Sequence, residues 1–394
     1  MAQIFEKTLV MILCGGKGER LYPLTRDRAK PSVPFLGTYR IIDFSLSNCL
    51  NSGLRKIVLL TQYKSLSLER HLRNGWNIFH PESRGYVISL PAQGRVGDRW
   101  YEGTADAVFQ NIYTIQQENP EVVLVLSGDH VYKADYRQML RFFSDTKADV
   151  VVLAKPVPRA EGRRFGVMRI ETDRRITEFL EKPKNPPALP SDENLTLASM
   201  GIYIFKTSNL IRALMQDAKN PKSSHDFGKD ILPRLIQDHQ VYAYPYQGYW
   251  EDIGTIDAYW KSNMAFLASA PPFDIHDQAW PLRTYQGQFA PAFIDRSLVH
   301  SSIIGAGCRV HRAEIRSSIL SPAVQIGEGA LIQDSIVFSR AQIGRGARLK
   351  KAIVDKNSII PDGFIVGEDS AADARWFKTY GDGIRLIPKN WKLV

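Results

Sequence analysis

A glycine-rich stretch near the start of the sequence, followed by a cluster of basic residues, has the composition of a phosphate-binding loop. Segment 13–31 reads LCGGKGERLYPLTRDRAKP, with three glycines at Gly15, Gly16 and Gly18. Glycine has no side chain, so backbone N–H groups can approach phosphate oxygens closely. Arg20 and Lys30 can then neutralise phosphate charge, the arginine as a bidentate donor and the lysine as a point charge.

The spacing of this stretch excludes two common nucleotide-binding motifs. The G-x-x-x-x-G-K-[ST] pattern of a P-loop is absent, and Leu21 stands where a dinucleotide fingerprint requires its third glycine. A glycine-rich turn with a purely structural role is therefore the alternative to a phosphate site. The basic residues that follow the glycines favour the phosphate site, and we expect it to hold a nucleoside triphosphate.

Two aspartates have the position and chemistry of ligands for a hard metal ion. Asp129, in SGDH, comes just after an apolar strand-like segment, and Asp252 lies in YWEDIGT. Ligands of open α/β sheets bind beyond the carboxyl ends of the strands, and Mg²⁺ prefers carboxylate and phosphate oxygens. We therefore predict that Asp129 holds Mg²⁺, with Asp252 as the natural second ligand. A capping or turn role is the alternative for each aspartate.

Up to about residue 270, strand-like and helix-like patterns alternate. Apolar runs of strand length are TLVMILCGG, KIVLLTQ, EVVLVLSGDH and ADVVVLAKPV. Apolar residues at helical spacing follow an expected N-cap at Thr104, and others lie within 136–143. Continuous apolar strands separated by helices predict an α/β fold with a Rossmann-like domain, whose mixed, mostly parallel sheet has both faces covered.

After about residue 295 the pattern changes to a repeat of five or six residues. The apolar residues that recur are Ile304, Val310, Ile315, Leu320, Ile326, Ile332, Val337, Ile343, Leu349, Val354, Ile360 and Val366. Such a hexapeptide repeat predicts a parallel β-helix, because each short strand buries one apolar side chain and stacked coils share one core. We expect a catalytic domain over 1–268, a linker over 269–292 and a left-handed β-helix over 293–394.

Composition restricts the class of protein further. The 394 residues carry a formal net charge of +10, which attracts anions, but the basic residues form neither a tail nor an aromatic-basic motif typical of nucleic-acid binding. No segment approaches the length of a membrane helix, and the N-terminus is a poor signal peptide. The three cysteines are far apart and lack metal-ligand spacing. We expect a cytoplasmic protein that binds neither nucleic acid nor membrane.

The first stretch resembles the signature of sugar-nucleotide pyrophosphorylases, G-G-x-G-x-R-L-x-x-L-T-x-x-x-x-K-P. Further blocks resemble the ADP-glucose pyrophosphorylase family, also called glucose-1-phosphate adenylyltransferases, and they include RIIDFSLSNCLNSG, WYEGTADAVFQN, FGVM, EFLEKP, ASMGIYIF, SSHDFGKDILP and YWEDIGTIDAYW. The resemblance runs from about residue 8 to the C-terminus. It implies that ATP and glucose 1-phosphate are converted to ADP-glucose and pyrophosphate, for glycogen or other α-glucan synthesis.

The resemblance also implies a role for individual residues. Asp129, Arg20 and Lys30 are expected to be catalytic, and Asp129 and Asp252 to bind the metal. The nucleotide is expected to contact Leu13, Gly15, Gly16, Gly18, Gln62, Gly103 and Thr104. Glucose 1-phosphate is expected to contact Tyr101, Gly166, Glu181, Lys182 and Ser199. His130 is not expected to act as a base, because the attacking phosphate is already ionised at neutral pH.

Regulation and assembly are further implications of the resemblance. The family is controlled by phosphorylated metabolites, and we expect phosphorylated or carboxylate effectors and a homotetramer. Gln62 and Trp100 are candidates for regulatory coupling, although packing is the simpler role for Trp100. Candidates for effector binding are Arg26, Asp27, Arg28 and Arg375. Asp27 is a departure, because some bacterial members carry a lysine implicated in activator binding at this position.

Three alternatives accompany this interpretation. Another sugar-1-phosphate nucleotidyltransferase would use UTP, dTTP or GTP. An acyltransferase is the alternative that hexapeptide β-helices raise, but His300 and His311 lie in no recognisable acyltransferase motif. A non-catalytic regulatory subunit would be expected to have lost the glycine loop, Lys30 or Asp129, and this chain retains all of them.

Overall fold

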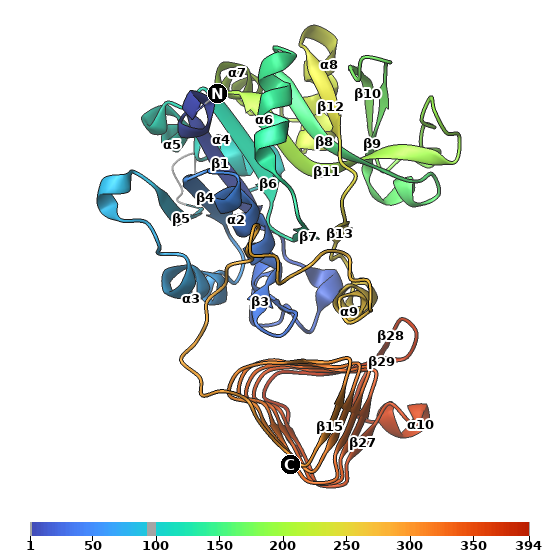
Figure 1. Cartoon of the computed structure of the whole chain (residues 1–394). Helices are drawn as coiled ribbons and strands as arrows, with labels where there is room; N and C mark the ends of the chain where they lie inside the picture. Colours follow the sequence, from blue (N-terminus) through green and yellow to red (C-terminus); the bar gives the residue numbers. More distant parts are fainter. Residues whose placement is uncertain (1, 93–99, 394) are drawn as a thin grey trace.

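The computed structural model describes residues 2–92 and 100–393, which form an α/β part followed by a β-helix (Figure 1). The predicted fold class is confirmed. Within those residues, no helix has both the length and the apolar character needed to cross a bilayer.

A mixed sheet forms the centre of the α/β part. Its strands are β1 (Thr8–Cys14), β4 (Lys56–Thr61), β5 (Tyr86–Pro91), β6 (Val122–Ser127), β8 (Val150–Pro158), β9 (Gly166–Ile170), β10 (Ile176–Glu181), β11 (Leu195–Lys206) and β12 (Val241–Pro245). The main path runs β10-β9-β11-β6-β1-β4-β5, and β8 pairs with β11 and β12. Strands β6, β1, β4 and β5 are parallel, so the carboxyl ends of β1 and β6 lie at one edge.

Helices cover both faces of this sheet. The helices of the α/β part are α1 (Ala2–Glu6), α2 (Ile41–Asn51), α3 (Leu66–Gly75), α4 (Thr104–Phe109), α5 (Ile112–Glu118), α6 (Tyr136–Asp145), α7 (Thr207–Asp217), α8 (Leu232–Asp238) and α9 (Ile256–Ala265), of which α9 packs toward the β-helix instead of on the sheet. Side chains of β1 alternate between the faces: Leu9 and Met11 pack with α4, α5, α7 and α8. Val10 and Ile12 pack with α2, α3 and α6. Apolar strands are therefore buried on both sides, as their sequence indicated.

The start of α4 corrects one expectation. The N-cap is Gly103 rather than Thr104, and the helix expected over 105–115 is interrupted between α4 and α5. The hydroxyl of Thr104 does not cap its own helix, because it donates to Asp226 and accepts the N–H of Phe227. A tertiary contact has replaced the local one.

Short elements connect the sheet to the candidate site. The paired strands are β2 (Pro34–Phe35) with β3 (Tyr39–Arg40), and β7 (His130–Tyr132) with β13 (Trp250–Asp252). Single turns of 3₁₀ helix are η1 (Glu19–Leu21), η2 (Lys30–Ser32), η3 (Pro81–Ser83) and η4 (Glu161–Arg164), and η5 (Phe227–Ile231) is a π-helix.

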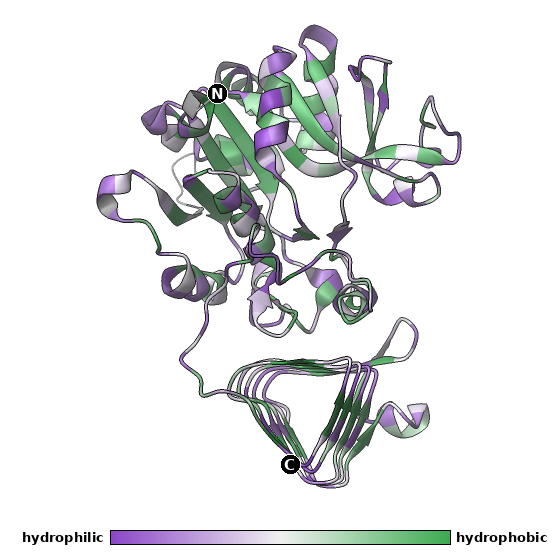
Figure 2. Ribbon diagram, viewed as in Figure 1, coloured by the Kyte–Doolittle hydropathy of each residue, from purple (hydrophilic) through white to green (hydrophobic). Residues whose placement is uncertain are grey.

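The C-terminal part is a triangular coil of parallel strands (Figure 1). Its sheets contain β14 (Phe293–Asp295), β17 (Arg309–His311), β20 (Gln325–Ile326), β23 (Gln342–Ile343) and β26 (Ile359–Ile360); β15 (Leu298–His300), β18 (Glu314–Arg316), β21 (Leu331–Gln333), β24 (Arg348–Lys350) and β27 (Ile365–Val366); and β16 (Ile303–Ile304), β19 (Ile319–Leu320), β22 (Ile336–Val337), β25 (Ala352–Val354), β29 (Ile384–Ile387) and β28 (Thr379–Tyr380). A short helix, α10 (Ser370–Asp373), precedes β28. Every residue of the predicted hexapeptide set lies in or against one apolar core. Figure 2 shows green, hydrophobic stretches along the coils.

One face of the β-helix packs on the α/β part through a second, outward row of apolar residues. Ile319, Ile336 and Ile353 occupy adjacent coils and are buried against a cluster that includes Phe35 and Tyr259. Between Ala265 and Phe293 the chain forms no helix or strand. This segment is fastened to α2, for example by Trp280 Nε1 donating to Asn48 Oδ1. The domain limits 1–268, 269–292 and 293–394 remain a prediction.

Candidate active site

The glycine-rich loop leaves β1 at the carboxyl edge of the sheet and borders an open cavity of about 460 Å³. The cavity is lined by Leu13, Gly16, Gly18, Arg20, Lys30 and Asp129, among others. Gly18 has a φ of +64° and precedes η1, and a β-carbon there would lie 3.0 Å from Thr25 and 3.2 Å from Lys30. Only glycine satisfies both the left-handed backbone and the close packing, so the loop bends sharply toward Lys30.

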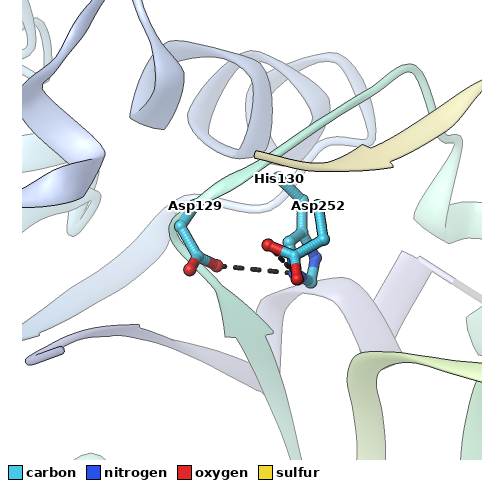
Figure 3. A group of neighbouring side chains, drawn as sticks. All are labelled: Asp129, His130 and Asp252. Atoms are coloured by element: carbon cyan, nitrogen blue, oxygen red, sulfur yellow. Dashed lines mark ion pairs between the residues drawn. The ribbon is translucent and has the colours of Figure 1, made fainter. Parts of the chain in front are cut away.

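Lys30 lies between the two predicted metal ligands. Its Nζ is 2.6 Å from Asp129 Oδ2 and 3.0 Å from Asp252 Oδ1. Asp129 follows β6 and Asp252 ends β13, and the antiparallel pairing of β13 with β7 places Asp252 opposite His130. Figure 3 shows the two carboxylates converging from these elements. Residues 99 and 222 positions from Lys30 in the chain thus meet at one point.

The charges at this point stabilise one another. Burial raises the pKa of Asp129, but the positive charge of Lys30 and hydrogen bonds from Lys30 and Ser127 outweigh this effect and hold that pKa well below its usual value. Burial lowers the pKa of Lys30, but the charges of Asp129 and Asp252 outweigh this effect, so the pKa of Lys30 lies above its usual value. At neutral pH Asp129 is therefore a carboxylate and Lys30 an ammonium group. Ionised carboxylates with oxygens close together are suitable ligands for a divalent cation.

His130 completes a group whose ligand atoms lie within 4.8 Å of one another. Trp250 Nε1 is 3.3 Å from His130 Nδ1, and an indole N–H can only donate. Nδ1 is therefore the acceptor, and the remaining ring proton of a neutral imidazole is on Nε2, which faces Asp129 Oδ1 at 3.4 Å. In this tautomer His130 offers Asp129 a proton donor, so the two aspartates are the residues that fit a metal ion.

A second cavity, of about 380 Å³, adjoins the first and shares Leu13 and Arg20 with it. It contains four of the five residues predicted to contact glucose 1-phosphate, namely Gly166, Glu181, Lys182 and Ser199. Strand pairing puts Gly166 opposite Glu181, and Lys182 Nζ is 2.6 Å from Glu181 Oε1. The lysine side chain is 60% exposed, so its charge is accessible to a ligand in the cavity.

Several predicted residues lie outside the lining of both cavities. Gly15, Gln62, Gly103 and Tyr101 do not line either one, and Thr104 lines the second cavity rather than the first. Gln62 Oε1 accepts the backbone N–H of Tyr101 at 3.0 Å, which ties the end of β4 to the loop before α4. A role of these residues in binding the nucleotide or sugar stays a prediction.

Trp100 corrects the expectation that it packs. Its side chain is 62% exposed, on the loop that leads to α4. The predicted role of Trp100 in regulatory coupling stays a prediction.

The second cavity also has walls that the sequence analysis did not assign. Arg164, Tyr203, Asp226, Gly228 and Trp250 line it. Asp226 and Gly228 belong to the SSHDFGKD block, which was noted only as a resemblance. Arg164 belongs to no motif that the sequence analysis used, and only the folded chain brings it to the same cavity as Lys182.

Comparisons with known proteins agree with this geometry. The family model of nucleotidyl transferases matches residues 9–269, and the model of a GlmU-like C-terminal hexapeptide region matches residues 292–387. Glucose-1-phosphate adenylyltransferase 2 of Vibrio parahaemolyticus is 48% identical, over 98% of this chain and 100% of its own length. The glucose-1-phosphate adenylyltransferases of Hydrogenovibrio crunogenus and Thiobacillus denitrificans are each 45% identical, over 97% and 98% of this chain and 94% and 91% of their own lengths.

Proposed function

This chain belongs to the glucose-1-phosphate adenylyltransferase family, and on that premise we propose how its own residues carry out the reaction. The enzyme makes ADP-glucose and pyrophosphate from ATP and glucose 1-phosphate. A phosphate oxygen of the sugar phosphate attacks the α-phosphorus of ATP. The bond from that phosphorus to the bridging oxygen breaks, and pyrophosphate leaves with the electron pair.

The observation that supports this mechanism is that the two cavities meet at three charged residues. Lys30 and Asp129 line the first cavity, Asp252 lines the second, and Lys30 contacts both aspartates. The glycine loop and Arg20 hold the triphosphate in the first cavity. Lys182 anchors the incoming phosphate in the second, and Glu181 contacts the sugar. Catalysis then rests on positioning and charge neutralisation, because the attacking oxygen needs no base.

Nucleotidyl transferases use a divalent metal ion, and we propose that it is Mg²⁺ here. Asp129 and Asp252 would hold it, since their carboxylate oxygens lie close together. When bound, the ion supplies positive charge to the substrate phosphates. Lys30 holds the pKa of Asp129 low and balances charge near the α-phosphate.

A direct assay tests the nucleotide preference. Pyrophosphate release from glucose 1-phosphate is measured with ATP, UTP, dTTP and GTP in separate reactions. We expect release with ATP to exceed that with each other nucleotide. Equal or faster release with another nucleotide would make the chain a different sugar nucleotidyltransferase, and no release with any of them would favour a non-catalytic subunit.

Replacing Lys182 with glutamine is expected to raise the KM for glucose 1-phosphate by about tenfold to a hundredfold, with the KM for ATP nearly unchanged. Lys182 lies in the second cavity only, and a charge-assisted hydrogen bond contributes about 1.5–3 kcal/mol. Initial rates with each substrate varied separately give both constants. Lys184→Gln is the matched control, because Lys184 is exposed and lines neither cavity. An equal rise for both substrates would assign Lys182 to the fold or to the metal.

We propose that effectors bind in the cleft between the α/β part and the β-helix. This cleft, of about 760 Å³, is lined by Arg26, Trp376 and Lys378, and it shares Arg20 with the nucleotide cavity. An effector there would contact the loop that holds the triphosphate. Arg375 is exposed and does not line the cleft, although Trp376 beside it does.

A group of cations at the contact between the α/β part and the β-helix further supports an anionic effector. Arg28 is paired with Asp355, while its Nη1 is buried without a partner among the described residues. Burial, with the nearby charges of Arg40 and Arg28, lowers the pKa of Lys356 to about 7. The cluster therefore has more positive than negative charge in contact, which a phosphate or carboxylate would balance.

Asp27→Lys is expected to strengthen activation by fructose 1,6-bisphosphate, to which the unaltered enzyme responds weakly. Asp27 Oδ2 is 3.5 Å from Lys389 and 3.4 Å from Arg26. The aspartate therefore forms ion pairs with two cations that could otherwise bind a phosphate. Activity is titrated with several sugar phosphates and small carboxylates. Asp145→Lys, at the exposed end of α6, makes the same charge change elsewhere. Strong activation of the unaltered enzyme at micromolar bisphosphate would contradict the proposal.

A homotetramer and a cytoplasmic location complete the proposal. The first coil of the β-helix supports an assembly of copies, because β14 and β15 each pair on one side only and expose Phe293 and Leu298. Three buried free thiols, Cys14, Cys49 and Cys308, support a reducing compartment.

A further inference from the structure

A buried histidine outside both cavities fastens the loop that follows α7. His225 Nδ1 is 2.7 Å from Asp217 Oδ2 at the end of α7, and both side chains are almost fully buried. Ser223 donates to the other oxygen of Asp217 at 2.7 Å and accepts the N–H of His225 at 2.9 Å. His225 has a φ of +53°, a left-handed backbone that a non-glycine residue adopts only when its surroundings hold it there.

The main chain of His225 receives the start of α4. Its carbonyl oxygen accepts the N–H groups of Ala105 at 2.8 Å and Asp106 at 3.3 Å, which the first turn of a helix leaves without partners. A β-carbon at Gly103 would lie 2.2 Å from that oxygen, so only glycine allows this approach. The histidine backbone thus takes the place of a local capping side chain.

The adjoining residues connect this contact to the second cavity. Thr104 donates its hydroxyl to Asp226 Oδ2 and accepts the N–H of Phe227, each at 3.0 Å. Asp226 Oδ1 accepts the N–H of Gly228 at 2.9 Å. Thr104, Asp226 and Gly228 all line the cavity assigned to glucose 1-phosphate. His225 itself does not line it, so its ring acts only through these neighbours.

We propose that the Asp217–His225 pair is a positioning device for glucose 1-phosphate binding. The hydrogen bond from Nδ1 holds the His225 main chain in its left-handed conformation, and that main chain fixes Thr104, Asp226 and Gly228 in the cavity wall. The inference rests on the proposed function, because it takes the ligand of this cavity from it. Loss of the bond widens the range of wall positions and weakens binding of the sugar phosphate more than binding of ATP.

A second ring contact offers a competing explanation. His225 Nε2 is 3.7 Å from a carboxylate oxygen of Glu102, whose side chain is 47% exposed. The two ring nitrogens can be separated by substitution. Asparagine places an amide nitrogen near the position of Nδ1 and tolerates the left-handed backbone, whereas glutamine places one near Nε2.

The experiment compares His225→Asn, His225→Gln and His225→Leu in the full-length enzyme. We expect His225→Leu and His225→Gln to raise the KM for glucose 1-phosphate by roughly tenfold, with a much smaller rise for ATP, and His225→Asn to stay within about threefold of the unaltered enzyme. Hydrogen exchange at the backbone amides of Ala105, Phe227 and Gly228 should accelerate in His225→Leu and His225→Gln and not in His225→Asn. His311→Leu is the matched control, because His311 Nδ1 is also 2.7 Å from an aspartate, on the β-helix.

Rescue by glutamine instead of asparagine would assign the effect to Glu102 and overturn the proposal. A lower melting temperature with unchanged KM values would also overturn it, since the pair would then serve stability alone. If His225→Leu does not fold, the comparison of asparagine with glutamine still decides. A failure of the proposed function appears differently, as an unaltered enzyme without turnover, and hydrogen exchange then still reports whether the pair holds the loop.

Discussion

The Asp129→Asn enzyme is expected to turn over about a hundredfold more slowly than the unaltered enzyme, or slower still. Removal of one electrostatic stabiliser from an active site typically has an effect of this size. Asparagine keeps the shape of the side chain but removes the charge that faces Lys30 at 2.6 Å and that would hold the metal. The KM values should change less than kcat, because the glycine loop and Lys182 still bind the substrates. Steady-state kinetics over a range of Mg²⁺ concentrations measure both.

Asp135→Asn is a suitable control for this variant. Asp135 lies six positions further along, caps α6 and is partly exposed outside both cavities. Its loss should leave kcat within about threefold. Turnover of Asp129→Asn within threefold of the unaltered enzyme would remove Asp129 from the catalytic role, and normal turnover restored by excess metal would assign it to metal affinity alone.

Asp355→Ala is expected to destabilise the protein by about 3–5 kcal/mol, the usual cost of removing one partner from a buried ion pair. Arg28 and Asp355 are 4% and 1% exposed, 2.8 Å apart, and join the α/β part to the β-helix. Asp355 also accepts the backbone N–H of Lys356 at 2.6 Å. Its loss leaves Arg28, Lys356 and Arg40 without the carboxylate that offsets the charge of Arg28 and Lys356.

Chemical denaturation monitored by fluorescence and by enzyme activity measures this effect. We expect the unfolding midpoint of Asp355→Ala to fall clearly. Asp362→Asn is the matched control, because its ion pair with Arg345 is solvent-exposed and salt-screened, and its midpoint should hardly change. An Asp355→Ala protein with the midpoint of the unaltered enzyme would show that the interdomain contact is carried by the apolar residues alone.

Local patterns predicted much of the fold. Strands β1, β4, β6 and β8 appear where the apolar runs indicated them, because a strand that is apolar at every position favours burial on both faces of a sheet. The hexapeptide repeat predicted the β-helix for the same reason, since each coil repeats one inward position. The start of α4 was predicted wrongly, because the hydroxyl of Thr104 bonds to residues more than a hundred positions away.

The outward apolar row of the β-helix could have been noticed in the sequence. Pairs of apolar residues recur in the strings SII, SIL, SIV and AIV, and we call these pairs doublets. Within them Ile319, Ile336 and Ile353 directly precede inward residues. A single coil needs only one of the two residues for its core. The doublets therefore indicate a covered outer face, although they do not reveal that Phe35 and Tyr259 cover it.

The sequence by itself determined which residue types were available for the chemistry. The bare backbone of the glycine loop, the carboxylates after the strands and the period of the coils are local properties, and local properties depend only on neighbouring residues. Tertiary structure alone decided that Lys30 lies between Asp129 and Asp252, and that Arg28 pairs with Asp355 across the contact between the α/β part and the β-helix. Charge–charge interactions act between atoms within a few ångströms, and only the folded chain determines which charges those are.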